Sequence, residues 1–361
     1  PDSVKRAVGA DQVRLYQRLG YPYNEQWKLV TSSTMNHGLQ QDSRVAIDIP
    51  VGDAVVRGRT RALPFLRHKT PTPQPPPGAM LYMDFAGPML ESQPHRYNCY
   101  CGVNDAGSGY FRLFPGHAMT ASFAEACLKS FIADIAAKLG FDTSFKPHVV
   151  RSDNGSAFVS HHFREFLVTE QIQQSLSTPY TPEQNSHVER SWGVCFANAR
   201  VFLAAANLPP TLHPFALQHS AWIMNRLPRP SRGRKSPYEL LVHELPDLKY
   251  LRTFGCLCSI EIPVPRRVGD RHFADRGTHG LYMGPSEQSP ASIVLMLPLL
   301  KPTLAAKIRS YEDKYPGIQG QSPLQLAGDE LLTGDPPTEI TYTNPMLTLA
   351  PPIHQVNNNP Q

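Results

Sequence analysis

The uneven distribution of proline constrains this chain most, because proline fixes one backbone dihedral and donates no backbone hydrogen bond. The chain has 36 prolines among 361 residues, about twice the usual share of roughly 5%. Five of them fall in Pro71–Pro77, which predicts a stiff polyproline II spacer. Residues 81–206 hold only six, an ordinary density. We therefore expect one folded stretch after residue 78, with proline-rich segments on both sides.

Composition excludes several classes of protein. No run of roughly 18 apolar residues occurs, so no transmembrane helix is expected. The first residues lack the apolar core of a secretory signal, and Pro1 in place of methionine indicates a fragment or a processed piece. Six cysteines are too few for a disulfide scaffold in a chain of 361 residues. We expect an intracellular protein in a reducing compartment.

Charge also varies along the chain, whose net charge is +5. Between Arg190 and Lys235 there are seven basic residues and no acidic ones. From Glu312 onward there are six acids and one lysine, in a proline-rich context that predicts disorder. The basic stretch favours a polyanionic partner, although a solvated surface explains the same charges.

The stretch after residue 78 is predicted to alternate strands and helices. Aromatic and β-branched runs predict strands over 81–85, 97–103, 110–114, 147–152 and 171–176. Helical spacing of apolar residues predicts helices over 122–139, 161–170 and 186–206. Ser122 with Glu125 resembles a capping box, and Gly140 is placed to end the first helix. The order βββαβαβα predicts a layered α/β domain.

Three acidic residues lie where these strands and helices end near loops. Asp84 lies in the first strand, Asp153 follows the fourth, and Glu189 opens the last long helix. Clustered carboxylates repel each other unless a cation shares them, and Mg²⁺ prefers such hard oxygen ligands. Two ions about 3.5–4 Å apart suit in-line attack at a phosphodiester. The trio therefore makes a candidate catalytic and metal-binding site.

Each acid also has a purely structural explanation. Asp84 is placed to start a turn before Gly87, and Asp153-Asn-Gly is a turn signal that needs no chemistry. Ser186 with Glu189 fits a capping box at the start of the last helix. Taken singly, each structural explanation is the better one.

The sequence around the acids changes that balance. The distinctive segments are Met83-Asp-Phe-Ala-Gly-Pro, Asp153-Asn-Gly-Ser-Ala-Phe and Ser177-Thr-Pro-Tyr-Thr-Pro-Glu-Gln-Asn-Ser-His-Val-Glu-Arg. They resemble the integrase core of copia-type LTR retrotransposons, in which about 35 residues separate the last two acids, as they do here. Later segments match in order, among them Asn225-Arg-Leu-Pro and Gly280-Leu-Tyr-Met-Gly-Pro-Ser. The resemblance covers about residues 10–290.

The resemblance implies an RNase H-like core: a mixed five-stranded sheet with helices on both faces. It implies that Asp84, Asp153 and Glu189 bind two Mg²⁺ (or Mn²⁺) ions. The reactions implied are hydrolysis at the ends of element DNA and strand transfer into target DNA. The partners implied are double-stranded DNA and further copies of the chain, and the place of action would be the nucleus. A nuclease of the same fold is a rival, since fold alone does not fix function.

Six residues near the acids are candidate DNA contacts: Asn154, Tyr180, Gln184, Asn185, Arg190 and Arg200. They either contact DNA or cap and pack the neighbouring helices and loops, and the sequence leaves both open.

The chain departs from the family in its first 70 residues, where the family carries a His-His-Cys-Cys zinc module. Tyr16 and Tyr21 stand at the histidine positions, and Gly52 and Val55 at the cysteine positions. None of the four is a zinc ligand, so we predict no zinc there. Small modules of this kind often fold only with metal, so this one is either misfolded or stabilised in another way.

Further departures are Glu183 for a usual glutamine and Ser186 for a usual glycine. These changes keep open an alternative function, that of a catalytically silent DNA-binding relic or a domesticated protein.

Five regions are expected along the chain: a degenerate zinc-module-like region (1–70), a proline-rich linker (71–78), the catalytic core (79–245), a small β-rich extension (246–300) and an acidic, disordered tail (301–361). Cys99 with Cys101, and Cys256 with Cys258, have strand-like spacing and are expected to be buried apolar residues. The pair His161-His162 is expected at the surface.

Overall fold

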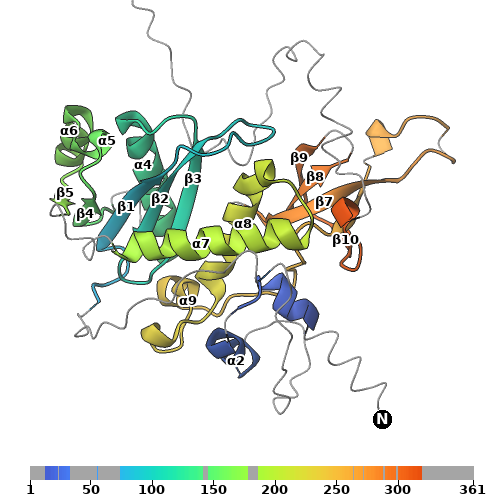
Figure 1. Cartoon of the computed structure of the whole chain (residues 1–361), viewed down its shortest axis with the longest axis horizontal. Helices are drawn as coiled ribbons and strands as arrows, with labels where there is room; N and C mark the ends of the chain where they lie inside the picture. The colour runs from blue at the N-terminus through green and yellow to red at the C-terminus, as the bar shows by residue number, and fades with distance from the viewer. Residues whose placement is uncertain are drawn as a thin grey trace, which may run out of the picture.

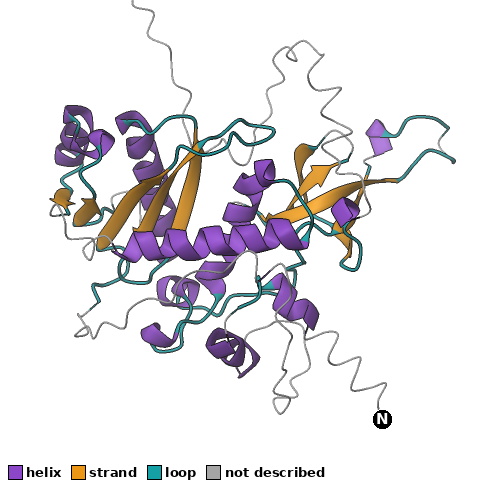
Figure 2. Ribbon diagram, viewed as in Figure 1, coloured by secondary structure: helices purple, strands orange, loops and turns teal. Residues whose placement is uncertain are grey.

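The computed structural model describes residues 13–22, 24–32, 55, 74–140, 145–177, 186–262, 264–270, 272–287, 289–297 and 300–318. Two five-stranded sheets lie toward opposite ends of the long helix α7 (Ser186–Ala205), as Figures 1 and 2 show. Within these residues, no helix is both long and apolar enough to cross a membrane.

The first sheet contains β1 (Met80–Ala86), β2 (Cys99–Asp105), β3 (Phe111–Gly116), β4 (Val149–Ser152) and β5 (Gln173–Leu176). Their order across the sheet is β3-β2-β1-β4-β5. The first three strands pair antiparallel, whereas β4 lies parallel to both β1 and β5. This mixed sheet is the RNase H-like arrangement, so the predicted fold and all five predicted strands are confirmed, with ends shifted by a few residues.

Helices cover both faces of this sheet. One face packs against α4 (Ala121–Leu139), α5 (Ser156–Val159) and α6 (His161–Thr169), and the other against α7 and α8 (His213–Arg226). Because strand side chains alternate between faces, Leu81 and Met83 pack on the face covered by α4, while Tyr82 packs on the face covered by α7. The alternation turns every second residue of β1 toward α7, which matters for the site.

The helix α4 ends as predicted but begins differently. Gly140 takes a left-handed conformation (φ 70°), and its N–H reaches the last carbonyl groups of the helix. The capping residue at the start is Thr120, whose hydroxyl accepts a hydrogen bond from the N–H of Phe123. The prediction that Ser122 caps this helix was wrong, because Ser122 already lies one residue inside it.

The predicted buried face of α7 is confirmed. Five apolar residues at helical spacing are all buried: Val188, Trp192, Cys195, Ala199 and Phe202. They pack on the first sheet and on α8, so α7 has a fixed rotation about its own axis. The four cysteines at 99, 101, 256 and 258 are buried as well, and His161 and His162 are exposed beside Glu165 and Glu125.

The second sheet contains β6 (Leu257–Glu261), β7 (Gly277–Pro285), β8 (Ser292–Met296), β9 (Lys301–Ala305) and β10 (Ile308–Tyr311). It is antiparallel throughout, in the order β10-β6-β7-β8-β9. Two of its strands lie beyond residue 300, so the boundary predicted there for a disordered tail was wrong. That prediction rested on proline content, but Pro302 lies in the edge strand β9, where a missing backbone hydrogen-bond donor is tolerated.

The remaining helical segments are short: α2 (Asn24–Ser32), α9 (Pro237–Val242), η2 (Pro210–Leu212), η3 (Pro230–Arg232), η4 (Val264–Arg266) and η5 (Pro316–Ile318). Residues 13–18 are helical too. The residues from 319 onward, Gly52 and the first three residues of the predicted linker (71–73) lie outside the described residues.

Aromatic packing joins the two described N-terminal helical segments. Tyr16 meets Tyr21 and Trp27 edge-on, with ring centroids 5.7 and 5.3 Å apart. Leu15 and Leu19 are buried beside them and join the same core as α7. Tyr16 and Tyr21 are thus packing residues, which is a stabilisation that needs no metal.

An ion pair links this N-terminal segment to the end of the second sheet. The guanidinium of Arg18 donates from Nε (2.7 Å) and Nη2 (2.5 Å) to the two carboxylate oxygens of Glu312. Glu312 also accepts hydrogen bonds from the N–H and the hydroxyl of Thr253, at 2.9 and 2.8 Å. Burial raises the pKa of Glu312, but Arg18 and Thr253 outweigh it, so the net pKa is lowered.

We expect Glu312→Gln to destabilise the protein by about 2–4 kcal/mol at neutral pH, because it leaves Arg18 half-buried without its charge partner. A lowered pKa stabilises the fold above the pKa of the unfolded chain, and that stability is lost as pH falls through the folded-state pKa. The difference between wild type and variant should therefore shrink in acid. Denaturant unfolding at several pH values measures it; a difference that persists at low pH would contradict the assignment.

Candidate active site

The strand register brings two of the three candidate acids to one edge of the first sheet. In the parallel pairing of β1 with β4, Tyr82 stands level with Arg151. Two residues further along the chain are Asp84, within β1, and Asp153, directly after β4, so both reach the carboxyl edge at the same level. Asp84 also shares a face with Tyr82, and that face packs against α7.

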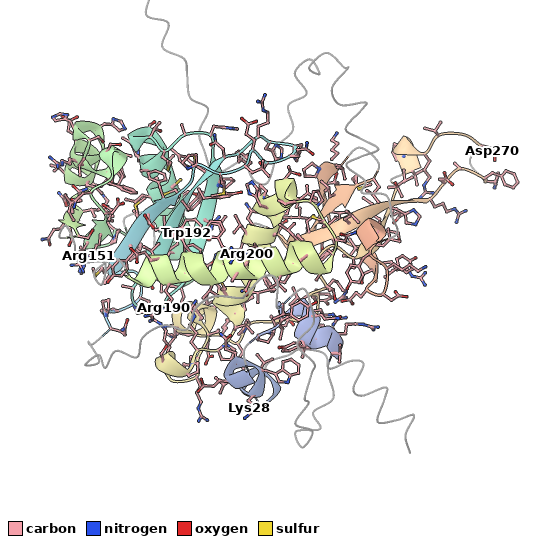
Figure 3. All side chains as sticks on the ribbon, in the orientation of Figure 1. Lys28, Arg151, Arg190, Trp192, Arg200 and Asp270 are labelled. Carbon is pink, nitrogen blue, oxygen red and sulfur yellow. The ribbon has the colours of Figure 1, made fainter. Side chains whose placement is uncertain are left out.

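The helix α7 supplies the third acid. Glu189 lies in its first turn and is exposed, while Val188 and Trp192 beside it are buried against the sheet. Since α7 packs across β1 and β2, its N-terminal turn comes near the edge that carries Asp84 and Asp153. Figure 3 shows Trp192 and Arg190 on opposite sides of this part of α7.

Electrostatics connects the three carboxyl groups. The pKa of Asp84 is raised from its usual 3.8 to about 7, first by burial and then by the negative charges of Asp153 and Glu189. A hydrogen bond from the backbone N–H of Phe85 lowers it only in part. A half-buried acid that senses two like charges is the environment that a bound cation relieves.

Local hydrogen bonds order the loop that carries Asp153. One carboxylate oxygen of Asp153 accepts a hydrogen bond from the N–H of Gly155 at 2.9 Å. The side-chain amide of Asn154 donates to the carbonyl of Ser177 at 2.9 Å, which ties this loop to the end of β5. For Asn154 the structure therefore shows a loop-ordering contact.

The other candidate DNA contacts divide into two groups. Tyr180, Gln184 and Asn185 lie outside the described residues. Arg190 and Arg200 are both exposed on α7 (Figure 3). Arg190 also borders a pocket together with Arg229 and Arg232. The sequence motifs did not single out these last two as site residues, although the acid-free basic stretch contains them.

The side-chain positions bear directly on metal ligation. Across the residues that the structure describes, no group of three or more His, Cys, Asp or Glu side chains lies close enough to hold a metal ion. The three acids are near enough to shift the pKa of Asp84, yet their side chains do not converge on one point.

Comparison with known proteins agrees with the fold. Residues 74–182 match the integrase core domain family, a segment that contains Asp84 and Asp153 and ends before Glu189. The Pol polyprotein of the Arabidopsis thaliana transposon RE2 is 31% identical over 147 residues, which are 41% of this chain and 10% of that protein. The Pol polyprotein of the Arabidopsis thaliana transposon RE1 is 29% identical over 165 residues. These residues are 46% of this chain and 11% of that protein. The chain thus spans about a tenth of the curated relatives it matches.

Solved structures of low identity also align. One is the catalytic core domain of human T-cell leukemia virus 2 integrase, solved in complex with magnesium. It is 22% identical, and the alignment covers 46% of this chain and 97% of that domain, with a TM-score of 0.35.

Residues 74–182 thus resemble the integrase core domain family, and their sheet has the RNase H-like strand order. More narrowly, the similar plant proteins are transposon polyproteins, in agreement with the resemblance to retrotransposon integrases that the sequence motifs indicated.

Proposed function

We propose that this chain carries out DNA integration: metal-dependent hydrolysis of phosphodiesters at element DNA ends, followed by strand transfer into target DNA. One observation supports the proposal above the others. Within an integrase core, Asp84, Asp153 and Glu189 come from three separate elements and are electrostatically coupled at one sheet edge. A purely structural role for each acid would not require that they affect one another.

The donor set fits divalent cations. Asp84, Asp153 and Glu189 would hold Mg²⁺ or Mn²⁺ through carboxylate oxygens, the hard ligands that these ions prefer. Two such ions, when bound, would supply an activated nucleophile and stabilise the leaving oxygen. Binding would also favour the charged form of Asp84, whose pKa is raised to about 7 first by burial and then by the charges of Asp153 and Glu189.

The chain's own residues orient the reactants. Asp153 is positioned by the N–H of Gly155, and Glu189 by the fixed rotation of α7. Basic residues of the stretch 190–235 would contact DNA phosphates, and such contacts make binding depend on salt. By analogy with the family, cutting at two DNA ends would involve more than one copy of the chain.

A joining assay with randomised DNA ends tests the proposal whatever end sequence the chain prefers. The chain is incubated with duplexes whose terminal positions are randomised, a plasmid target and Mg²⁺ or Mn²⁺, and joined products are sequenced. We expect joining that disappears with a chelator. Cleavage without joining would instead favour a nuclease of this fold. Salt-sensitive DNA binding with neither reaction would favour the catalytically silent relic.

A further inference from the structure

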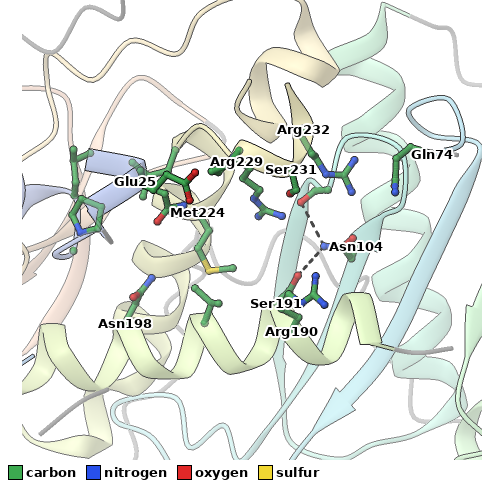
Figure 4. Close-up of a pocket in the computed structure, with 18 residues that line it drawn as sticks. Glu25, Gln74, Asn104, Arg190, Ser191, Asn198, Met224, Arg229, Ser231 and Arg232 are labelled. Carbon is green, nitrogen blue, oxygen red and sulfur yellow. Dashed lines mark hydrogen bonds between the residues drawn. The ribbon is translucent and has the colours of Figure 1, made fainter. Parts of the chain in front are cut away.

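A pocket of about 480 Å³ lies beside α7, and Figure 4 shows it in close-up. Its walls come from four parts of the chain: the N-terminal segment around Gly20 and Glu25, Gln74, the end of β2 with the turn after it, and the stretch 227–232 that follows α8. The helix α7 closes the remaining side with Arg190, Ser191, Val194 and Asn198. Pockets of this size accommodate small-molecule ligands.

The pocket is separate from the candidate active site. Residues advance by roughly 100° around an α-helix, so the pocket-lining residues of α7 lie roughly 100–200° around the axis from Glu189. Glu189 and the pocket therefore occupy opposite flanks of the same helix. A ligand in the pocket would not compete with the carboxylates of the candidate active site.

Three guanidinium groups face this pocket. Arg190 comes from α7, Arg229 follows α8, and Arg232 ends η3 (Figure 4). Gly109 makes room for two of them, since a Cβ there would lie 3.0 Å from Nε of Arg232 and 3.1 Å from Nη1 of Arg229. Gly109 also has φ 77°, so a larger residue is disfavoured on two grounds.

The three charges have few acidic neighbours; the negative charge of the buried Asp105 acts on Arg232. Arg232 is anchored by hydrogen bonds to the carbonyl groups of Ala106 (3.0 Å) and Gly107. Among the residues that the structure describes, no carboxylate forms an ion pair with Arg190 or Arg229, and Glu25 is the one acid in the pocket wall. The pKa of Arg229 is lowered to about 10, by burial first and then by the charges of Arg232 and Arg190.

We propose that this pocket is a binding site for a phosphate-bearing anion, with Arg190, Arg229 and Arg232 as its ligands. Guanidinium groups present planar pairs of N–H donors that match phosphate oxygens, which a single ammonium group does not. Neutral polar groups complete the wall: the side-chain amide of Asn104 donates to the hydroxyl of Ser191 at 3.0 Å. An anion would neutralise a cluster that otherwise repels itself.

The phosphate can come from a free polyphosphate or from the DNA backbone, and both present the same chemistry to the arginines. The proposal does not depend on catalysis, because the pocket and Glu189 lie on opposite flanks of α7. Glu189→Gln should therefore leave anion binding unchanged even if it abolishes strand transfer.

Thermal unfolding and calorimetric titration with inorganic triphosphate, at constant ionic strength, test the proposal. We expect triphosphate to stabilise the wild-type chain and Arg190→Gln to weaken its binding roughly tenfold or more. Arg190 is exposed, so this variant should fold, and without triphosphate it should unfold at the wild-type temperature or slightly above it. Arg229→Gln should weaken binding further if it folds.

Arg234→Gln is the matched control, because Arg234 is exposed in the same segment but does not line the pocket. Equal weakening in Arg190→Gln and Arg234→Gln, or no binding to wild type, would overturn the proposal. A short duplex DNA identifies the source of the phosphate. If triphosphate displaces the bound duplex and Arg190→Gln weakens duplex binding, the site takes the DNA backbone. If neither change affects duplex binding, the site takes a free anion.

Discussion

Glu189→Gln is expected to reduce strand transfer by roughly a thousandfold or more, because a site whose groups act as a unit fails when one is removed. Glutamine keeps the size of the side chain and removes the charge that would hold the cation. Glu189 is exposed, so its replacement should leave the unfolding temperature almost unchanged. Joining measured with excess enzyme, beside the unfolding curve, separates lost chemistry from lost folding.

Glu165→Gln is the matched control, since Glu165 is an exposed acid on α6 that no part of the proposed site uses. It should retain full joining activity. Wild-type activity in Glu189→Gln would remove Glu189 from the site and leave the helix-capping explanation in its place.

A companion experiment at Asp84 uses stability instead of activity. The raised pKa of Asp84 means that its contribution to stability is fully present below its unfolded-state value and is lost as pH rises through about 7. Without metal, Asp84→Asn should therefore be more stable than wild type at pH 8, by on the order of 4 kcal/mol at most. The two should converge near pH 4, and added Mg²⁺ should stabilise only the wild type.

Gly102→Val is expected to produce the second large effect, a destabilisation of about 2–3 kcal/mol together with loss of joining activity. Gly102 lies in β2 directly opposite Asp84 in the strand register. A Cβ at this position would lie 2.5 Å from Cζ2 of Trp192 and 3.0 Å from Cε2 of Phe111. Because Trp192 fastens α7 to the sheet, displacing the indole would also displace Glu189, three residues before it.

Gly193→Ala serves as the control for Gly102→Val. A Cβ at Gly193 meets nothing within 4 Å, and alanine favours a helix by about 0.5–1 kcal/mol, so this variant should be slightly more stable. Combining Gly102→Val with Trp192→Leu should recover part of the lost stability, because the smaller side chain vacates the space. Simple additivity of the two changes would refute steric conflict as the cause. Chemical denaturation measures all four variants.

The sequence predicted most of the core, because its signals are local. The five strands and the three helices of the first domain follow from side-chain periodicity, and Gly140 ends its helix through its own backbone freedom. The three acids were found through the motifs around them, while their positions taken singly favoured the structural explanations. Their electrostatic coupling depends on the parallel pairing of β1 with β4, which no local pattern contains.

The features that sequence reasoning missed depend on distant parts of the chain. Arg229 and Arg232 belong to a recognisable basic stretch, but the pocket they line also needs walls from residues 19–26 and Gln74. Proline content suggested a disordered tail from residue 301. Instead, β9 pairs with β8 and β10 pairs with β6, so residues 301–311 complete the second sheet. Glu312 likewise looked like part of an acidic tail, and its partner Arg18 lies 294 residues earlier.

That separation has a consequence for how the protein is made. During synthesis, the segment around Arg18 leaves the ribosome long before Glu312 has been translated, so its charge stays without this partner while the core forms. The mixed sheet and α7 can assemble first, and the N-terminal segment can pack on that core, but its ion pair forms only after Glu312 has been made. Closing so long a loop is slow, but its entropic cost is only slightly larger than that of closing a loop half as long. The Arg18–Glu312 ion pair is therefore among the late contacts of folding during synthesis.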